Sequence, residues 1–401
     1  MAPPPPIPLE EAQQRLLAGI VPLEAEEIPA PDASGRYLAA PLLARRTQPA
    51  ADLSAMDGYA MRADDLAGPW RVVGESAAGH LYRGQLAAGE AIRISTGALM
   101  PDGMGVVLLQ ENAMRDGDTL SLNGEGEPTP RHIRRRGFDF AEGEELLPAG
   151  TRIGPAQLAL AIAGGHAALP VHRLPRVAVL DSGDELAADP SACAPHQIPA
   201  SNGAMLAAMA APLASHMERI GPVADDLPAF ASALSRAEGA DVLVTSGGAS
   251  VGDHDLLQPA LAAWGAKTDF WRVAMKPGKP LLVARRGAQF IVGLPGNPVS
   301  SYVTAFLFLM PLLRALAGAA DPLPRPAPMR LAGELPAGGS RLEFIRAICA
   351  GGSVAPILQR DSSAMRALAL ADALIVHPAG APARRDGEEV QVYMLGNGCI
   401  A

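Results

Sequence analysis

Two lysines stand three residues apart in the segment Lys276-Pro277-Gly278-Lys279-Pro280, and they are two of only three lysines among 401 residues. The other thirty of the 33 basic residues are arginine, so the chain uses arginine wherever any cation serves. The lysine pair therefore indicates a place that needs a compact, strongly hydrated ammonium rather than a planar guanidinium. Two ammonium groups held by a Pro-Gly turn predict a receptor for a small, multiply charged anion. Chance placement in a surface turn is the alternative.

A glycine-rich loop follows the apolar run Ala240–Thr245 and ends in two carboxylates. Its glycines would let backbone amides approach a phosphate, and its hydroxyls would donate hydrogen bonds. It lacks the Gly-Lys-Ser/Thr ending of a P-loop and the spacing of a dinucleotide fingerprint, so a plain turn is an equal alternative. Asp253 and Asp255 at its end suit magnesium ligands or groups that orient water, and Asp255 is the candidate metal ligand.

A second loop, Gly293–Ser300, precedes a long apolar run. Asn297 is a favourable N-cap and Pro298 a favourable first helical residue, which is a complete structural explanation. The same geometry leaves an open helix N-terminus, which favours anions. Because this loop follows the lysine pair closely, we predict that it binds an anion as well. A third loop, Asp181–Glu185, by itself indicates only a solvated acidic turn.

The elements that must position these loops alternate between strands and helices. The predicted strands are Arg176–Leu180, Ala240–Thr245 and Phe290–Gly293, and the predicted helices are Leu9–Ala18, Arg152–Ala168, Asn202–Met217 and Val299–Leu316. Alternation of this kind predicts a parallel sheet with functional loops at the carboxyl ends of its strands. On either side, Gly and Pro punctuate short apolar runs, which indicates β-rich modules.

We therefore predict a multidomain protein of the α/β plus β class. The predicted parts are helical regions at 7–27 and 141–174, a β-rich module (28–140), a parallel-sheet α/β domain (175–320) and a small C-terminal β-domain (324–401). The run Val299–Leu316 is apolar, but serines interrupt it and Arg314 lies near its end, so we predict a buried core helix and no membrane span.

Composition narrows the classes of function. Hydrophobic content of 49% and charged content of 19% are those of a folded soluble protein. A net charge of −9 disfavours nucleic-acid binding, which needs broad basic surfaces, so a basic anion site must be local. The cysteines Cys193, Cys349 and Cys399 have no disulfide or metal-ligand spacing. That pattern, with the absence of a signal-peptide pattern at the N-terminus, favours the cytoplasm.

Several motifs lie in an order and spacing that resemble one family, the molybdopterin molybdenumtransferases. This is the MoeA family, to which the C-terminal part of gephyrin also belongs. The motifs are Met56-Asp57-Gly58-Tyr59-Ala60, Thr96-Gly97-Ala98, Gly137-Phe138-Asp139, Ser246-Gly247-Gly248, the lysine turn, Pro295-Gly296-Asn297-Pro298-Val299-Ser300, Arg341–Arg346 and Ser362–Met365. The resemblance spans almost the whole chain.

The resemblance implies insertion of molybdate into adenylylated molybdopterin, with release of AMP and with Mg²⁺ as cofactor. It also implies an elongated molecule in which 7–27 and 141–174 form one linker domain, 28–140 is an inserted domain, the α/β domain is MogA/MoaB-like and the C-terminal domain is β-barrel-like. It further implies a homodimer whose active cleft is shared between subunits, and contacts with other proteins of molybdenum cofactor biosynthesis. The residues it assigns to catalysis are Asp57, Thr96, Asp139, Glu185, Asp225 and Asp255. Those it assigns to the pterin substrate are Ser246, Gly247, Gly248, Ser250, Pro295, Gly296, Asn297, Pro298 and Ser300. Those it assigns to molybdate are Lys276, Lys279, Arg346, Ser362 and Ser363.

The sequence departs from the family's pattern at a few positions. Phe138 stands where an acidic residue is usual, and Asp372 stands where Asn is common. Two other classes of function stay open. A non-catalytic scaffold would not need Lys279 or Asp255, and a generic Mg-dependent phosphohydrolase would need neither the lysine pair nor the Asp57 motif. Dependence of the reaction on molybdate separates these classes.

Overall fold

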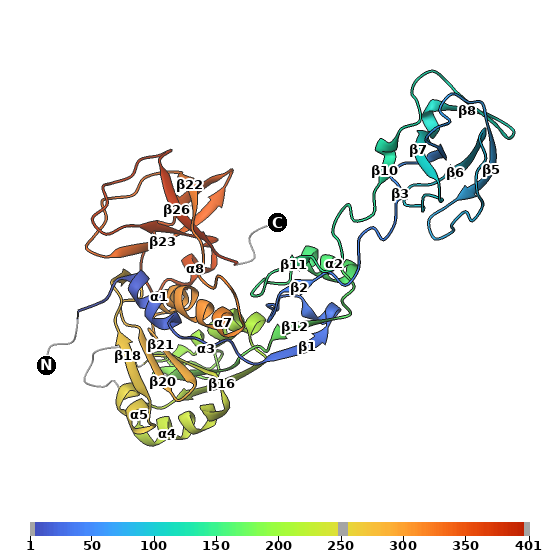
Figure 1. Cartoon of the computed structure of the whole chain (residues 1–401). Coiled ribbons are helices and arrows are strands. Elements are labelled where there is room, and N and C mark those ends of the chain that lie inside the picture. The colour runs from blue at the N-terminus through green and yellow to red at the C-terminus, as the bar shows by residue number, and fades with distance from the viewer. Residues whose placement is uncertain (1–4, 248–255, 397–401) are drawn as a thin grey trace.

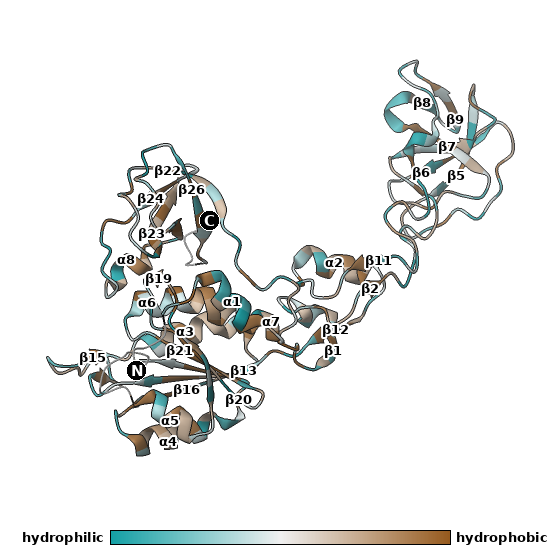
Figure 2. Cartoon of the chain, turned by 60° about the vertical axis from the view of Figure 1, so that its left-hand side comes forward, coloured by the Kyte–Doolittle hydropathy of each residue, from teal (hydrophilic) through white to brown (hydrophobic). Residues whose placement is uncertain are grey.

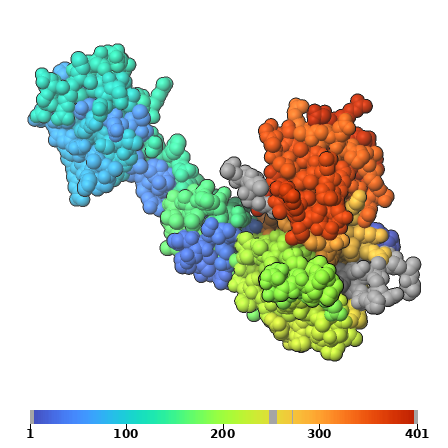
Figure 3. Space-filling view, turned by 180° about the vertical axis from the view of Figure 1, so that it is seen from behind, coloured from blue at the N-terminus to red at the C-terminus, as the bar shows by residue number. Residues whose placement is uncertain are grey.

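The computed structural model describes residues 5–247 and 256–396 and shows an elongated molecule (Figure 1). The α/β domain and the C-terminal barrel form one body, and a small linker domain leads from it to a distal β-rich module. The space-filling view shows the distal module standing clear of the body (Figure 3). The predicted elongated α/β plus β architecture is confirmed.

A six-stranded sheet forms the centre of the body, in the order β16-β13-β17-β21-β20-β18. Its strands are β13 (Arg176–Ser182), β16 (His216–Val223), β17 (Val242–Ser246), β18 (Lys267–Trp271), β20 (Leu282–Arg286) and β21 (Gln289–Leu294). The first four strands in this order are parallel, as the sequence predicts, but β20 pairs antiparallel with both β21 and β18, so the sheet is mixed. A turn at Gly287 and Ala288 joins β20 to β21, and strands joined so closely must be antiparallel.

Successive residues of the central strands contribute to two different hydrophobic cores, because side chains alternate across a strand. Val177 and Val179 pack in one core, with α1, α3 and the helix that begins at Pro298. Ala178 and Leu180 pack in the other, with α4 and α5. Figure 1 accordingly shows helices on both sides of the sheet. These helices are α1 (Leu9–Leu17), α3 (Asn202–Ala210), α4 (Leu227–Arg236) and α5 (Leu257–Ala263).

One helix lies between the sheet and the barrel (Figure 2). It consists of α6 (Pro298–Thr304), a π-helical turn η6 (Ala305–Leu309) and α7 (Met310–Leu316). Within the described residues it is the one helix long and apolar enough to cross a membrane, with a mean hydropathy of 1.6. However, 78% of the apolar stretch is buried inside the molecule. The predicted core helix is confirmed.

The predicted helix Asn202–Met217 is too long. The structure ends α3 at Ala210, continues with a short 3-10 turn η4 (Ala211–Leu213), and begins the edge strand β16 at His216. Pro212 lies in the turn, and the pairing of β16 with β13 overrides the helical pattern of the last residues.

The linker domain joins segments that are far apart in the sequence. Its strands are β1 (Ala25–Pro29), paired with β12 (Ala168–His172), and β2 (Leu42–Leu43), paired with β11 (Glu145–Leu147); its helices are η1 (Ala30–Ala33) and α2 (Pro155–Ala163). The strand pairing therefore shows that residues 25–43 and 145–172 fold together in one domain. The distal module begins near Leu53 rather than at residue 28.

The distal module is a six-stranded sheet in the order β7-β4-β6-β5-β9-β8. Its strands are β4 (Gly58–Arg62), β5 (Trp70–Ser76), β6 (Glu90–Ile94), β7 (Met104–Leu109), β8 (Ala113–Asp116) and β9 (Thr119–Leu122). Two short 3-10 turns, η2 (Gln110–Asn112) and η3 (Pro130–His132), and the pair β3 (Leu53–Ser54) and β10 (Ile133–Arg134) complete it.

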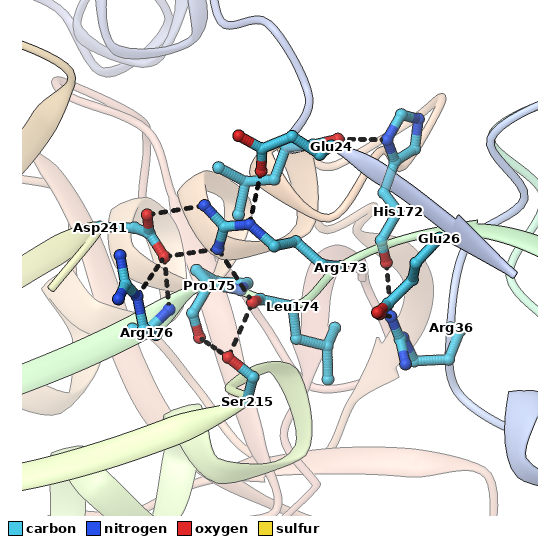
Figure 4. Close-up of polar contacts among 11 residues, drawn as sticks. Glu24, Glu26, Arg36, His172, Arg173, Leu174, Pro175, Arg176, Ser215 and Asp241 are labelled. Atoms are coloured by element: carbon cyan, nitrogen blue, oxygen red, sulfur yellow. Dashed lines mark hydrogen bonds and ion pairs between the residues drawn. The ribbon is translucent and has the colours of Figure 1, made fainter. Parts of the chain in front are cut away.

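A polar network fastens the linker domain to the α/β domain (Figure 4). Arg173 donates two hydrogen bonds to the carboxylate of Asp241, at 2.7 and 2.9 Å, and one to Glu24, at 2.6 Å. The backbone N–H of Arg176 adds a bond of 2.7 Å to Asp241. Burial opposes ionisation of Asp241, but these hydrogen bonds outweigh it and lower its pKa. The paired charges hold the start of β13 in place.

The C-terminal domain is a closed barrel in which β23-β24-β22-β26-β25 returns to β23. Its strands are β22 (Ala327–Leu331), β23 (Leu342–Ala350), β24 (Ser353–Pro356), β25 (Ala373–His377) and β26 (Glu389–Met394), with the short helix α8 (Met365–Ala369). A strand of the preceding domain, β19 (Met275–Lys276), pairs with β23. The first lysine of the pair thus lies on the junction between the two domains.

Candidate active site

The lysine turn is held between the α/β domain and the barrel. Lys276 lies in register with Glu343 of β23, and the two side chains form an ion pair of 3.7 Å. Gly278 has a φ of +101°, and a Cβ there would lie 2.5 Å from the side chain of Thr304. Only glycine fits this turn, because the helix that begins at Pro298 packs directly behind it. The sequence Lys-Pro-Gly-Lys therefore constrains the backbone of the turn, and both lysines line the cavity beside it.

A cavity of about 270 Å³ opens beside this turn and is strongly cationic. Its charged lining consists of Lys276, Lys279, Arg341, Arg346, Arg360 and the single carboxylate Glu343. Ser300 and Ser362 add hydroxyl groups. Five cations against one carboxylate give this cavity a charge that suits an anion with more than one negative charge.

Arg346 lies at the back of the cavity and is only 4% exposed. Its guanidinium donates hydrogen bonds to three backbone carbonyls, those of Gln359, Asp361 and Ala364, at 2.7 to 3.0 Å. Burial lowers its pKa. Arg346 therefore shapes the loop 359–364 as well as lining the cavity, and the backbone carbonyls occupy part of its donor capacity.

A second, larger pocket of about 710 Å³ lies at the carboxyl ends of β13, β17 and β21. Its polar lining consists of Asp181, Ser182, Glu185, Ser201, Asn202, Ser246, Gly247, Gly296, Asn297 and Ser363. The small strands β14 (Leu186–Ala187) and β15 (Ile198–Pro199) form one wall. Open α/β sheets bind ligands at this edge, so the pocket lies where the parallel strands predict a site.

The loops around the larger pocket are connected to one another. Asn202 donates hydrogen bonds to the Ser246 hydroxyl, at 2.9 Å, and to the Gly296 carbonyl, at 2.6 Å. Gly247 has a φ of +96°, and a Cβ there would lie 2.6 Å from the Ser182 carbonyl. The predicted glycine loop thus needs a glycine at its first position, and Asn202 links that loop to the one before α6.

Polar atoms in this pocket are left for a ligand. The Ser182 hydroxyl and the Asn202 amide oxygen are buried and have no hydrogen-bond partner in the described part of the chain. Asn297 precedes α6, but its side chain makes no capping bond and instead lines the pocket. Because buried polar groups are normally paired, these atoms indicate a polar ligand.

The two cavities are neighbours, separated by the start of α6 and by the loop that contains Ser362 and Ser363. Pro298 lines the larger pocket, and Val299 lines the cationic cavity. Likewise, Ser362 lines the cationic cavity, and Ser363 lines the larger pocket. A single ligand that enters the larger pocket can therefore place one end beside an anion held in the cationic cavity.

Carboxylates gather at the side of the larger pocket that Glu185 lines. Asp184 accepts a hydrogen bond of 3.1 Å from the backbone N–H of Asp225. Loss of solvent and the charges of Asp184 and Glu185 raise the pKa of Asp225, although its side chain is on the surface. This edge therefore carries negative charge that a cation would stabilise. Within residues 5–247 and 256–396, no three His, Cys, Asp or Glu side chains lie close enough to hold a metal ion.

Asp181 is 5% exposed, and burial raises its pKa to about 6, although the Gly203 N–H donates to it. Between about pH 3.8 and 6 this group is ionised in the unfolded chain but protonated in the folded one, so stability falls as pH rises through this window. We expect Asp181→Asn to remove this loss of stability and so to raise the free energy of unfolding by up to roughly 3 kcal/mol.

The measurement is the melting temperature of both chains at pH 4 and at pH 7. The advantage of the Asn variant over the unmodified chain should be larger at pH 7. Asp102→Asn, at an exposed position, is the control and should show no such pH dependence. A constant difference between the Asp181 variant and the unmodified chain would show that this carboxyl ionises normally.

The Asp57 and Thr96 loops lie together on the distal module, and Asp139 lies on the connector to the linker domain, where its backbone N–H donates to the Gln48 carbonyl at 3.0 Å. The carboxylate of Asp57 accepts the backbone N–H of Thr96 at 2.6 Å, and this bond, with the Thr96 hydroxyl, lowers the pKa of Asp57. Gly58 is required here, because a Cβ would lie 2.0 Å from the Leu108 carbonyl oxygen. Figures 1 and 3 show the module far from the body. Within one chain, these residues do not reach either cavity.

The structure therefore groups most of the predicted site residues of the body. Lys276, Lys279, Arg346 and Ser362 line the cationic cavity, and so does Ser300. The other predicted pterin-site residues that the structure describes line the larger pocket, with the exception of Pro295. Glu185 and Ser363 line the larger pocket as well. Gly248, Ser250 and Asp255 lie outside the described residues. Sequence reasoning missed Asn202 and Arg360. Asn202 begins a predicted helix, and Arg360 stands two residues before Ser362, so proximity to predicted motifs was the available signal.

Comparison with known proteins covers the chain in three parts. Residues 7–165 match the model described as the MoeA N-terminal region (domain I and II). Residues 178–315 match a probable molybdopterin binding domain, and residues 328–395 match the MoeA C-terminal region (domain IV).

Individual relatives match over nearly their full length. The molybdopterin molybdenumtransferase of Bacillus subtilis is 32% identical, over 97% of this chain and 94% of its own. Molybdopterin molybdenumtransferase 2 of Mycobacterium tuberculosis is 34% identical, over 92% and 94%. The crystal structure of a molybdopterin biosynthesis MoeA protein from Pyrococcus horikoshii superimposes with a TM-score of 0.83 at 26% identity, over 98% of this chain and 100% of its own. This chain therefore belongs to the MoeA family of molybdopterin molybdenumtransferases.

Proposed function

We propose that the protein inserts molybdenum from molybdate into adenylylated molybdopterin and releases AMP. The observation that carries this proposal is the pairing of a small cationic cavity with a larger polar pocket on either side of the α6 start. Such a pair suits a reaction between a small oxyanion and a larger phosphorylated substrate.

Molybdate is a compact tetrahedral dianion, and the cationic cavity suits it. Lys276 and Lys279 project from a turn that cannot widen, since Gly278 packs against Thr304. Glu343 neutralises part of the charge of Lys276, so Lys279 supplies the ammonium without a carboxylate partner among the described residues. Two or more fixed cations around one oxyanion would lower the free energy of charge that develops during the transfer.

The larger pocket suits the pterin and its phosphates. The backbone around Gly247 and the start of the helix at Pro298 would hold phosphate groups, because a helix N-terminus presents unpaired N–H groups and a positive dipole end. Ser182 and Asn202 offer buried polar atoms to the remainder of the substrate. No described group in the pocket is activated as a covalent nucleophile, so catalysis rests on positioning and charge neutralisation.

Magnesium is the cofactor that this reaction implies. Glu185 and Asp225, with Asp255 outside the described residues, are the oxygen ligands that would hold it. Burial first, and then the nearby charges of Asp184 and Glu185, raise the pKa of Asp225, and a bound cation would offset both effects. Bound there, the ion would neutralise charge on the phosphoanhydride.

We further propose that the protein acts as a homodimer. The Asp57, Thr96 and Asp139 loops carry polar groups away from both cavities, and the extended linker presents them to another molecule (Figure 1). In a two-fold dimer, the distal module of one subunit would complete the cavities of the other.

The test is incubation of the protein with adenylylated molybdopterin, Mg²⁺ and molybdate, with AMP and active cofactor as readouts. We expect AMP release that depends on molybdate and stops when the Mg²⁺ is chelated. Equal AMP release with and without molybdate would indicate a phosphohydrolase. Absence of AMP release from folded protein under both conditions would favour a scaffold.

A further inference from the structure

Three sulfur atoms meet on the C-terminal barrel, at a place that the proposed reaction does not use. The Cys349 sulfur lies 3.8 Å from the sulfur of Met329 and 3.9 Å from the sulfur of Met394. The three residues come from β23, β22 and β26, so the closure of the barrel brings them together. Cys349 is a free thiol.

These sulfurs are accessible to a small ion. Met394 is 40% exposed, and Cys349 and Met329 are half-buried against the barrel core. A metal ion bound to three sulfurs at about 2.3 Å in a plane would hold those sulfurs about 4 Å apart. The two measured separations are close to that value, so an ion could enter with little movement of the strands.

We propose that Cys349, Met329 and Met394 form a binding site for a soft monovalent metal ion, of which the cuprous ion is the first-row example. A thiolate with two thioethers selects Cu(I), whereas zinc prefers thiolate, imidazole and carboxylate ligands. Among the described residues, no three His, Cys, Asp or Glu side chains gather here or elsewhere. Hard or borderline divalent ions therefore lack a ligand set at this place.

Asp372 adds negative charge behind the sulfurs. It is 6% exposed, and its carboxylate accepts the backbone N–H of Cys349 at 2.7 Å. This contact fixes the backbone of the ligand and favours a bound cation.

Binding of the ion displaces the thiol proton. The thiol S–H bond breaks, a sulfur–copper bond forms, the proton passes to solvent, and copper stays Cu(I) throughout.

The experiment is an anaerobic titration of the full-length protein with Cu(I), in competition with a chromogenic Cu(I) chelator. The starting chain carries Cys193→Ser and Cys399→Ser, which leaves Cys349 as its only thiol. We expect one Cu(I) per chain. X-ray absorption of the loaded protein should show copper surrounded by three sulfurs.

Two variants in this background test the ligands. Cys349→Ser, and Met329→Leu with Met394→Leu, should each weaken Cu(I) binding by more than about tenfold, because even residues behind the ligands carry effects of that size. The Leu replacements keep the side-chain volume, and an unchanged melting temperature confirms folding. The proposal would be overturned if either variant bound Cu(I) as tightly as the starting chain, or if the starting chain did not bind Cu(I).

Discussion

Replacing Lys279 by arginine is expected to reduce molybdate-dependent AMP release by about a hundred- to a thousandfold, the usual effect of losing one preorganised anion-stabilising donor. The charge is kept, but the guanidinium is wider and planar, and it favours bidentate pairing over contact with a compact tetrahedral anion. The turn cannot move to accommodate it, because Gly278 packs against Thr304. Lys279→Ala should be more severe. Steady-state AMP formation at saturating molybdate measures both variants.

The matched control is Lys267→Arg, which is the same exchange at an exposed position of β18, outside both cavities. It should leave turnover unchanged. All three variants should melt at the temperature of the unmodified chain, because Lys279 is exposed and contributes little to stability. Near-normal turnover of Lys279→Arg would show that the scarcity of lysine does not mark the oxyanion site. Lys276 and Arg346 would then have to hold the anion.

The part of the site that follows from local sequence could be predicted. Strands β13, β17 and β21 are apolar runs that end in polar loops, and parallel strands place such loops at one edge of the sheet. Gly278 and Gly247 have a positive φ and leave no room for a Cβ, which only glycine tolerates. The sequence indicates both turns, because each glycine stands in a short motif.

Long-range contacts could not be predicted in the same way. The pairing of Lys276 with Glu343 joins two domains, and no local pattern sets that register. Asn202 acts through bonds to Ser246 and Gly296, which are distant in sequence. The pairing of the edge strand β18 with β20 also depends on tertiary contacts, which local propensity does not set.

The motif around Asp57 likewise does not predict that Asp57 lies far from both cavities. Gly58 follows Asp57 because the chain there passes directly against β7 and leaves no room for a Cβ. Only the fold shows that the module lies at the far end of a linker. This separation is what makes a shared site testable, because mutations in the two parts should complement one another.

A mixture of an Asp57→Ala chain and a Lys279→Ala chain is therefore expected to regain activity that neither chain has alone. In a mixed dimer, one site combines both defects and is inactive, while the other combines the intact Asp57 loop of one subunit with the intact lysine turn of its partner. Random exchange makes half of the dimers mixed, so the mixture should recover about one quarter of the activity of the unmodified protein.

The measurement is molybdate-dependent AMP release before and after subunit exchange, with heterodimers quantified through a different affinity tag on each chain. A mixture of Lys276→Ala and Lys279→Ala chains is the control. Both of these residues line the same cavity of one chain, so every site in that mixture keeps a defect and activity should not return. If Asp57 instead acts only within its own chain, demonstrated heterodimers of the first mixture will be as inactive as the parent variants. Recovery to about one quarter in the first mixture, and none in the control, would place Asp57 and Lys279 at one site contributed by two subunits.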